Sequence, residues 1–175
     1  MKIKNSLLLL FLGISTSASS AVNSDRQSIQ FMNVNLDPVQ LLVGSTSVAV
    51  DFGISESITI GPSMYYSYHS LGVTTGQSIV LGMRSIFFLG HARFTDGWFV
   101  TPFFQWGKSS SSLNLTGNGP VLGVDVGYWW FWESGVNVGL GLGLKYNTID
   151  LKNLGLDTRG SATSPSFLVQ FGYSF

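Results

Sequence analysis

Cysteine is absent from the 175-residue chain, and histidine occurs only at His69 and His91. Without cysteine there can be no disulfide, no thiolate metal site and no lipid-modified cysteine of a lipoprotein. The two histidines lie too far apart for a metal pair on one helix, and neither has an acidic residue at ligand spacing beside it. We therefore expect neither a metal ion nor a cofactor.

Charge is also scarce. Charged residues make up 10% of the chain, whereas 45% of the residues are hydrophobic and 14% are aromatic. Soluble domains usually contain roughly 25% charged residues, so part of this apolar surface must face something other than water. The 9 basic and 9 acidic residues balance, and no basic excess supports a nucleic-acid partner.

Long hydrophobic runs are missing as well. No stretch approaches the roughly 20 apolar residues that a membrane-spanning helix needs. The apolar run from Leu7 to Ile14 follows Lys2 and Lys4 and precedes the small residues 19–21, which is the order of a secretory signal peptide. We expect residues 1–21 to be removed after export, and residues 22–175 to form a single domain.

The remainder of the chain alternates between apolar residues and small or polar ones. In the clearest segment the even positions from Val136 to Tyr146 are apolar, and the odd ones include Gly139, Gly141 and Gly143. Such alternation predicts strands, and about ten residues suffice for a strand tilted near 45° to cross a membrane. Eight segments follow this pattern, two of them weakly: residues 28–36, 45–54, 58–69, 78–88, 98–106, 122–130, 136–146 and 165–175.

The connections alternate in length. Short turns are expected near residues 55–56 and 133–135, and long polar loops over residues 108–119 and 147–162. With an even strand count, both chain ends lie on the periplasmic side and the long loops on the cell surface. The sequence therefore predicts an all-β fold: a closed, antiparallel, up-and-down transmembrane β-barrel of about eight strands.

A soluble sandwich or a lipocalin-like barrel would alternate too, so the direction of each face has to be inferred. The polar face contains mostly Gly, Ser, Thr and Asn with few charges, which suits a narrow interior better than a surface in water. Inward glycines would leave room for Tyr65, Phe99, Phe103 and Trp129. Single charges also fall on this face, and we predict that they form a polar network in the lumen rather than a conducting path: Asp51, Arg84, Asp125 and Lys145.

Aromatic residues cluster at the segment ends, as in the two aromatic girdles of membrane barrels. Toward the periplasm they are Trp98, Trp130, Trp132, Tyr173 and Phe175, and toward the surface Tyr66, Tyr68, Trp106 and Tyr146. The last strand also resembles the terminal signal that the barrel-assembly machinery reads in bacterial outer-membrane proteins, through Phe167, Val169, Phe171, Tyr173 and Phe175.

In strand number, loop alternation and size the chain resembles the small eight-stranded group that includes the OmpA transmembrane domain, OmpX and OmpW. The resemblance implies a monomer in the outer membrane of a Gram-negative bacterium, with lipid around it and a structural or surface-interaction role. Two alternatives stay open: an OmpW-like channel for small apolar molecules, and a lipid-modifying enzyme. For the enzyme, the adjacent His69 and Ser70 lack an evident acid to complete a catalytic set, so we expect no enzymatic activity.

Overall fold

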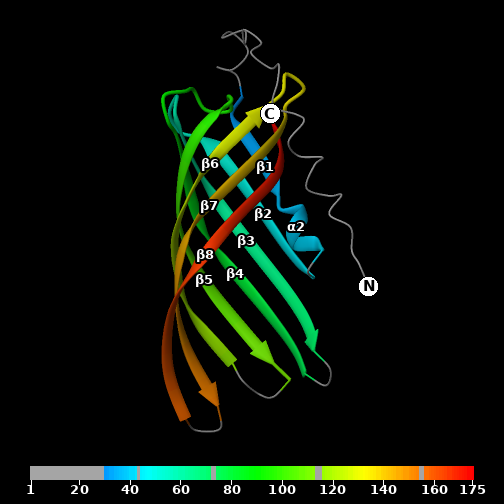
Figure 1. Ribbon diagram of the computed structural model, residues 1–175, viewed down its shortest axis with the longest axis vertical. Coiled ribbons are helices and arrows are strands. Elements are labelled where there is room, and N and C mark those ends of the chain that lie inside the picture. Colours follow the sequence, from blue (N-terminus) through cyan, green and yellow to red (C-terminus); the bar gives the residue numbers. More distant parts are fainter. Residues whose placement is uncertain (1–29, 43, 72–73, 113–115, 154–155) are drawn as a thin grey trace, which may run out of the picture.

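The chain folds into a closed barrel of eight antiparallel strands, each hydrogen-bonded to its neighbours in chain order (Figure 1). This computed structural model describes residues 30–175 except 43, 72–73, 113–115 and 154–155, and leaves undescribed the side chains of 69, 71, 74, 149 and 151–159. β1 pairs with β8 and closes the sheet. The predicted all-β, up-and-down, eight-stranded barrel is confirmed, whereas the expected leader over residues 1–21 lies outside the described residues.

Strand length rises steadily along the chain. The strands and one short helix are β1 (Met32–Leu36), α2 (Pro38–Leu41), β2 (Ser45–Gly53), β3 (Ile58–Leu71), β4 (Thr74–Phe88), β5 (Gly97–Ser111), β6 (Thr116–Phe131), β7 (Val136–Asn153) and β8 (Leu156–Ser174). β1 has 5 residues and β8 has 19. One wall of the barrel is therefore much taller than the other.

The two ends of the barrel differ accordingly. The C-terminus and the connections β2–β3, β4–β5 and β6–β7 lie together at one end, which we call the turn end, while β3 to β8 extend toward the other, which we call the long end (Figure 1). α2 lies partway down the barrel because β1 stops early. Asp37 caps this helix by accepting hydrogen bonds from the amides of Val39 and Gln40, at 3.1 and 3.2 Å, and Pro38 occupies its first turn.

The prediction of long polar loops over residues 108–119 and 147–162 is wrong. β5 continues to Ser111, β6 begins at Thr116, and β7 and β8 remain paired as far as Asn153 and Leu156. Residues 108–112 and 116–119 are polar or small at every position, and the apolar residues Ile149 and Leu151 have the parity opposite to those of Val136–Tyr146, so the alternation of the other segments does not continue there.

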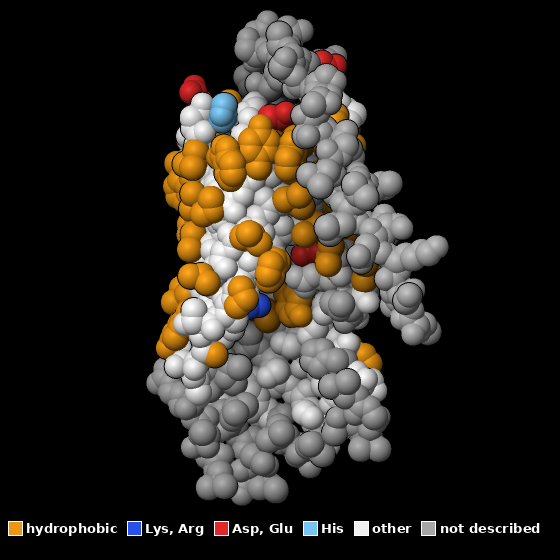
Figure 2. Space-filling view, in the orientation of Figure 1, with side chains coloured by type: hydrophobic (Ala, Val, Ile, Leu, Met, Phe, Trp, Pro, Cys, Tyr) orange, Lys and Arg blue, Asp and Glu red, His pale blue; other side chains and the backbone are white. Residues whose placement is uncertain are grey.

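The apolar face of the strands points outward. Exposed fractions of 51% for Phe104, 63% for Leu142 and 68% for Phe167 show how open these side chains are. Figure 2 shows hydrophobic side chains over much of the outer wall, below acidic and histidine side chains at the rim of the turn end. The buried apolar cluster inside is small and consists of Ile86, Phe88, Phe99, Trp129 and Leu168. The barrel thus places most of its apolar side chains on the outside.

Inward glycines accept the large side chains of the lumen. A Cβ atom at Gly139 would lie 2.7–2.8 Å from the ring of Trp129, and one at Gly141 would lie 3.3 Å from Phe99. Gly123 is similarly placed beneath Phe103. The glycine-rich inward face of β7 therefore provides space in a barrel whose interior holds little more than side chains.

Three of the five prolines lie where backbone pairing is interrupted. Pairing of β2 with β3 skips Pro62, pairing of β4 with β5 skips Pro102, and pairing of β6 with β7 skips Pro120. Pro165 on β8 is paired with β7, but lies beyond the four residues that pair with β1. Because proline has no N–H to donate, it fits an edge or a gap in a sheet.

We predict that Gly139→Ala destabilises the barrel by about 1–3 kcal/mol, since the new methyl group would overlap the ring of Trp129, which is itself buried. Urea unfolding followed by tryptophan fluorescence measures the loss. Gly160→Ala is the matched control, because a Cβ atom there meets nothing within 4 Å. Equal midpoints for the two variants would show that the glycines of β7 do not accommodate the luminal aromatic rings.

Candidate functional site: the lumen

The interior of the barrel is lined by small and polar side chains. Asn33, Asn35, Asp51, Thr59 and Asn137 are at most 1% exposed, and each lies opposite the outward apolar face of its strand. A buried polar group costs free energy unless it is hydrogen-bonded. In the described part of the chain, Asn33, Asn35, Asp51 and Asn137 are hydrogen-bonded to other side chains, whereas the Thr59 hydroxyl has no hydrogen-bond partner. The lumen is therefore the place where the few polar groups of the barrel can act together.

An arginine bridges the lumen in the half nearer the turn end, since Arg84 lies close to the turn-end terminus of β4. The Arg84 guanidinium on β4 donates to both carboxylate oxygens of Asp51 on β2, at 2.8 and 2.5 Å, and to the Gln170 side chain on β8 at 2.9 Å. Asn35 on β1 donates to the same carboxylate at 2.7 Å. The two-pronged contact fits the planar guanidinium, and it ties together strands on opposite sides of the barrel.

Asp125 and Lys145, the other two predicted network residues, are arranged differently. Asp125 is 4% exposed and is hydrogen-bonded to the Ser166 side chain, with the charges of Arg84 and Lys145 acting on it. Its Oδ1 atom has no hydrogen-bond partner, and no ion pair joins it to Lys145 in the described part of the chain. Of the four charges predicted to share the lumen, the structure thus joins Asp51 and Arg84 in an ion pair.

A cluster of asparagines lies between the arginine and the turn end. The Asn33 amide donates to Asn35 at 3.1 Å, and Asn137 donates to Asn33 at 2.9 Å and to the Ser174 hydroxyl at 3.1 Å. These contacts link β1 to β7 and β8 where the barrel closes. This cluster was not predicted from the sequence, although the alternation of Asn33 and Asn35 with Met32, Val34 and Leu36 could have revealed it.

Aromatic side chains fill the turn end beside the asparagines. The ring of Phe94, from the β4–β5 connection, lies 6.4 Å from Phe88 and 6.1 Å from Phe131 between ring centroids. Trp129 lies 5.9 Å from Phe99 and 5.5 Å from Phe131. We call these five rings the aromatic plug. Together with the asparagines and the arginine bridge, the aromatic plug fills the lumen at the turn end.

Phe94 reaches this position through an unusual backbone. Its φ angle is 58°, in the left-handed region that bulky residues rarely adopt, and its side chain is only 2% exposed. Such a conformation costs on the order of 1–3 kcal/mol and persists where packing compensates for it. The connection is thereby folded back so that its phenyl ring closes the barrel instead of facing solvent.

Features of catalysis are sparse in the lumen. Among the residues that the structure describes, no group of three or more His, Cys, Asp or Glu side chains could hold a metal ion. The backbone of His69 pairs with Gly76 near the long end, but its side chain is among those not described. His91 lies exposed in the β4–β5 connection at the turn end. The two histidines are therefore at opposite ends of the barrel.

The predicted terminal signal forms the outward face of β8. Phe167, Phe171, Tyr173 and Phe175 are between 44% and 68% exposed, and Val169 has the same parity and is partly exposed. The rings of Tyr173 and Phe175 are 4.8 Å apart. The side chains of this motif are thus accessible on the outer wall next to the seam between β1 and β8.

Comparison with known proteins adds no relative. No protein-family model, no curated protein and no solved structure matches the chain. Within the described residues, no helix combines the length and the apolar character needed to cross a membrane. Conclusions about function therefore depend on the geometry of the barrel itself.

We predict that Asp51→Ala lowers the free energy of unfolding by about 3–5 kcal/mol, because it leaves the Arg84 guanidinium buried without its counter-charge. The double variant Asp51→Leu with Arg84→Met should recover most of the loss, since it removes both charges. Urea titration of the refolded barrel provides the measurement, with Glu56→Gln in an exposed turn as control. A loss as large in the double variant as in the single one would contradict this role of the ion pair.

Proposed function

We propose that residues 22–175 form an outer-membrane β-barrel with a closed lumen, which acts as a structural or surface-interaction protein without catalytic activity. The single observation that carries this proposal is the outer wall. On β3 to β8, the outward positions between the two aromatic clusters contain no Asp, Glu, Lys or Arg. Apolar surface left in water costs roughly 25 cal/mol per Å², so a surrounding of lipid hydrocarbon accounts for this wall.

The aromatic clusters support the same placement. Toward the turn end, Trp98 is 57% exposed and packs edge-on against Tyr128 at 5.7 Å, and Trp130 is 37% exposed. Toward the long end, Trp106 and Tyr146 are 53% and 44% exposed. Aromatic side chains prefer the two interfaces of a bilayer, and apolar side chains such as Val124 and Leu142 lie between these clusters.

The orientation follows from the even number of strands. Both chain ends would lie at the periplasm with the turn end, as in other single-chain barrels, and the long end would project from the cell. The leader expected at residues 1–21 would carry the chain across the inner membrane, and the exposed outward side chains of β8 would be available to the barrel-assembly machinery. The tall β5–β8 wall would then present polar strands at the surface.

The closed lumen favours a structural or surface role over a channel. The aromatic plug and the asparagine cluster lie side by side at the turn end, where Phe131 pairs with Asn137, and the arginine bridge lies farther along the lumen. Phe99 and Trp129, which could have lined a route for apolar molecules, are 0% and 1% exposed and pack against each other. A solute would have to displace several buried side chains to pass.

Gel mobility tests the membrane barrel, and transport measurements test the closed lumen. Mature protein refolded into detergent should migrate faster before heating than after, and should resist protease only before heating. Reconstituted into planar bilayers or vesicles, it should give no conductance and no uptake of small apolar solutes, with a general porin as positive control. A protein that is soluble and monomeric without detergent contradicts the membrane placement, whereas stepwise currents or uptake contradict the closed lumen.

A further inference from the structure

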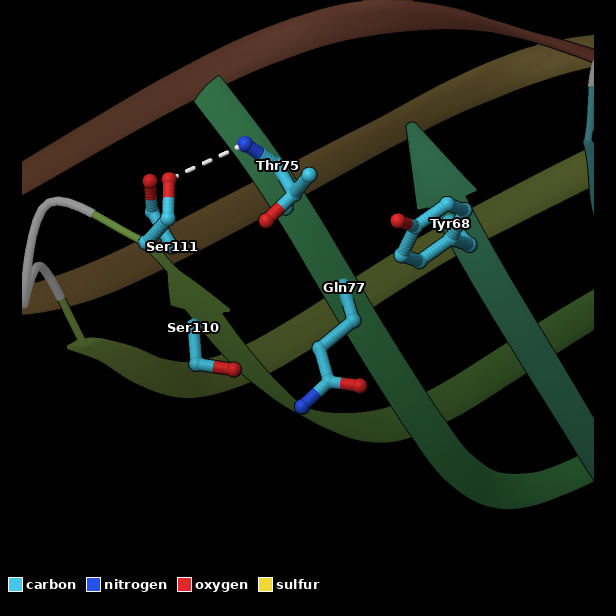
Figure 3. A pocket seen from close by; sticks show the side chains of 7 residues that line it. Tyr68, Thr75, Gln77, Ser110 and Ser111 are labelled. Carbon is cyan, nitrogen blue, oxygen red and sulfur yellow. Dashed lines mark hydrogen bonds between the residues drawn. The ribbon is translucent and has the colours of Figure 1, made fainter. Parts of the chain in front are cut away.

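A hollow lies on the outer wall near the long end. It has a volume of about 280 Å³, and its lining includes Tyr68 from β3, Thr75 and Gln77 from β4, and Ser110 and Ser112 at the end of β5 (Figure 3). Tyr68, Gln77 and Ser110 have the outward parity of their strands. The hollow therefore opens to the outside of the barrel and is separate from the lumen.

The strand ends that form the hollow are fixed to one another. The Thr75 amide donates to the Ser112 hydroxyl at 3.0 Å, and the Ser112 amide donates to the Thr75 carbonyl at 2.8 Å. Tyr68 is held from the other side, because its amide donates to the Gly44 carbonyl at 3.0 Å. These contacts use backbone groups and one hydroxyl, and they do not involve the side chains of Gln77 and Ser110, which line the hollow (Figure 3).

Three successive rows of outward side chains grade from polar to apolar across β3, β4 and β5. The row in the hollow is Tyr68, Gln77 and Ser110, the next toward the middle of the barrel is Tyr66, Ile79 and Lys108, and the third is Met64, Leu81 and Trp106. Neighbouring strands are about 4.8 Å apart, so each row spans about 10 Å. The hollow thus lies where the apolar wall ends, with an exposed lysine at the boundary.

The order of these groups along the wall, first polar, then cationic and then apolar, fits a molecule whose parts have the same order. The amide of Gln77 and the hydroxyls of Ser110 and Thr75 can exchange hydrogen bonds with a polyol, and the ring of Tyr68 offers an apolar face beside a polar hydroxyl. The Lys108 ammonium can bind a phosphate as a point charge, and an aliphatic stem of this length can lie along an apolar surface. Closer to the middle of the barrel than Lys108, Leu81 and Trp106 offer a surface for acyl chains.

We propose that the hollow binds the phosphorylated sugar headgroup of a glycolipid in the outer leaflet, with its acyl chains lying over the apolar row. The inference rests on the membrane placement proposed above, which brings the hollow to the level of the headgroups. Lys108 contacts the phosphate, Gln77 and Ser110 contact sugar hydroxyls, and Tyr68 packs against the sugar ring. The site would anchor one lipid on the β3–β5 wall.

Native mass spectrometry of the refolded mature barrel, titrated with lipid A, tests this proposal. We expect the wild-type barrel to retain one lipid A, and Lys108→Gln and Gln77→Leu each to weaken binding about tenfold, which corresponds to about 1.4 kcal/mol. Dephosphorylated lipid A should bind the wild type as weakly as lipid A binds Lys108→Gln. Glu133→Gln, which alters an exposed charged residue in the β6–β7 connection at the turn end, is the matched control and should bind like the wild type.

Other results would overturn the proposal. Equal retention by all variants would place the lipid elsewhere, equal retention of phosphatidylglycerol would show that the sugar is not recognised, and equally tight binding of glucosamine phosphate would identify a site for a soluble ligand. Every variant is also run unheated and heated on a gel. A normal mobility shift without lipid A binding refutes the glycolipid site alone, whereas loss of the shift in the wild type refutes the membrane barrel as well.

Discussion

The structure depends on one constraint: a closed sheet gives each side chain only two directions, and eight strands leave too little space inside for an apolar core. The buried apolar cluster amounts to five side chains, so most apolar residues lie on the outer wall. Closure satisfies the backbone hydrogen bonds along the paired strands, which is what permits such a wall to contact hydrocarbon. Polar groups then have to be accommodated in the lumen, where hydrogen bonds such as those of the Arg84, Asp51 and Gln170 bridge offset the cost of burial.

The parts of the strands that form the apolar wall were predictable because their two faces have different surroundings. The segment from Val136 to Tyr146 shows this most clearly, since leucines and valines point outward while glycines accept Trp129 and Phe99. Beyond the aromatic clusters the pattern does not continue: Ile149 and Leu151 fall on odd positions, opposite in parity to the apolar positions from Val136 to Tyr146, and residues 157–162 are mostly small or polar, although both stretches are paired strands. Backbone pairing continues there independently of side-chain pattern. α2 was missed because a four-residue helix has no period to detect, although Asp37 followed by Pro38 is a typical helix start.

The candidate site could be predicted in part. Parity alone placed Asp51, Arg84, Asp125 and Lys145 on the inner face, but it could not say which charges meet, because that depends on the stagger between strands that are distant in sequence. Arg84 and Gln170 are separated by 86 positions, yet their side chains are hydrogen-bonded at 2.9 Å. Phe94 lies in a turn, where no alternation operates, and its burial depends on a left-handed backbone. The closure of the turn end therefore became visible only in three dimensions.

The same division between an outer and an inner face assigns the five tryptophans opposite surroundings: Trp129 is 1% exposed in the lumen, while Trp106 on the outer wall is 53% exposed. Quenching of tryptophan fluorescence by brominated acyl chains measures this difference directly, in variants that keep only one of these two residues and have phenylalanine at the other four positions. If lipid surrounds the apolar wall, brominated lipid should quench Trp106 strongly and Trp129 weakly. Equal quenching of the two, or quenching of Trp129 alone, would contradict the assignment of the apolar face to lipid.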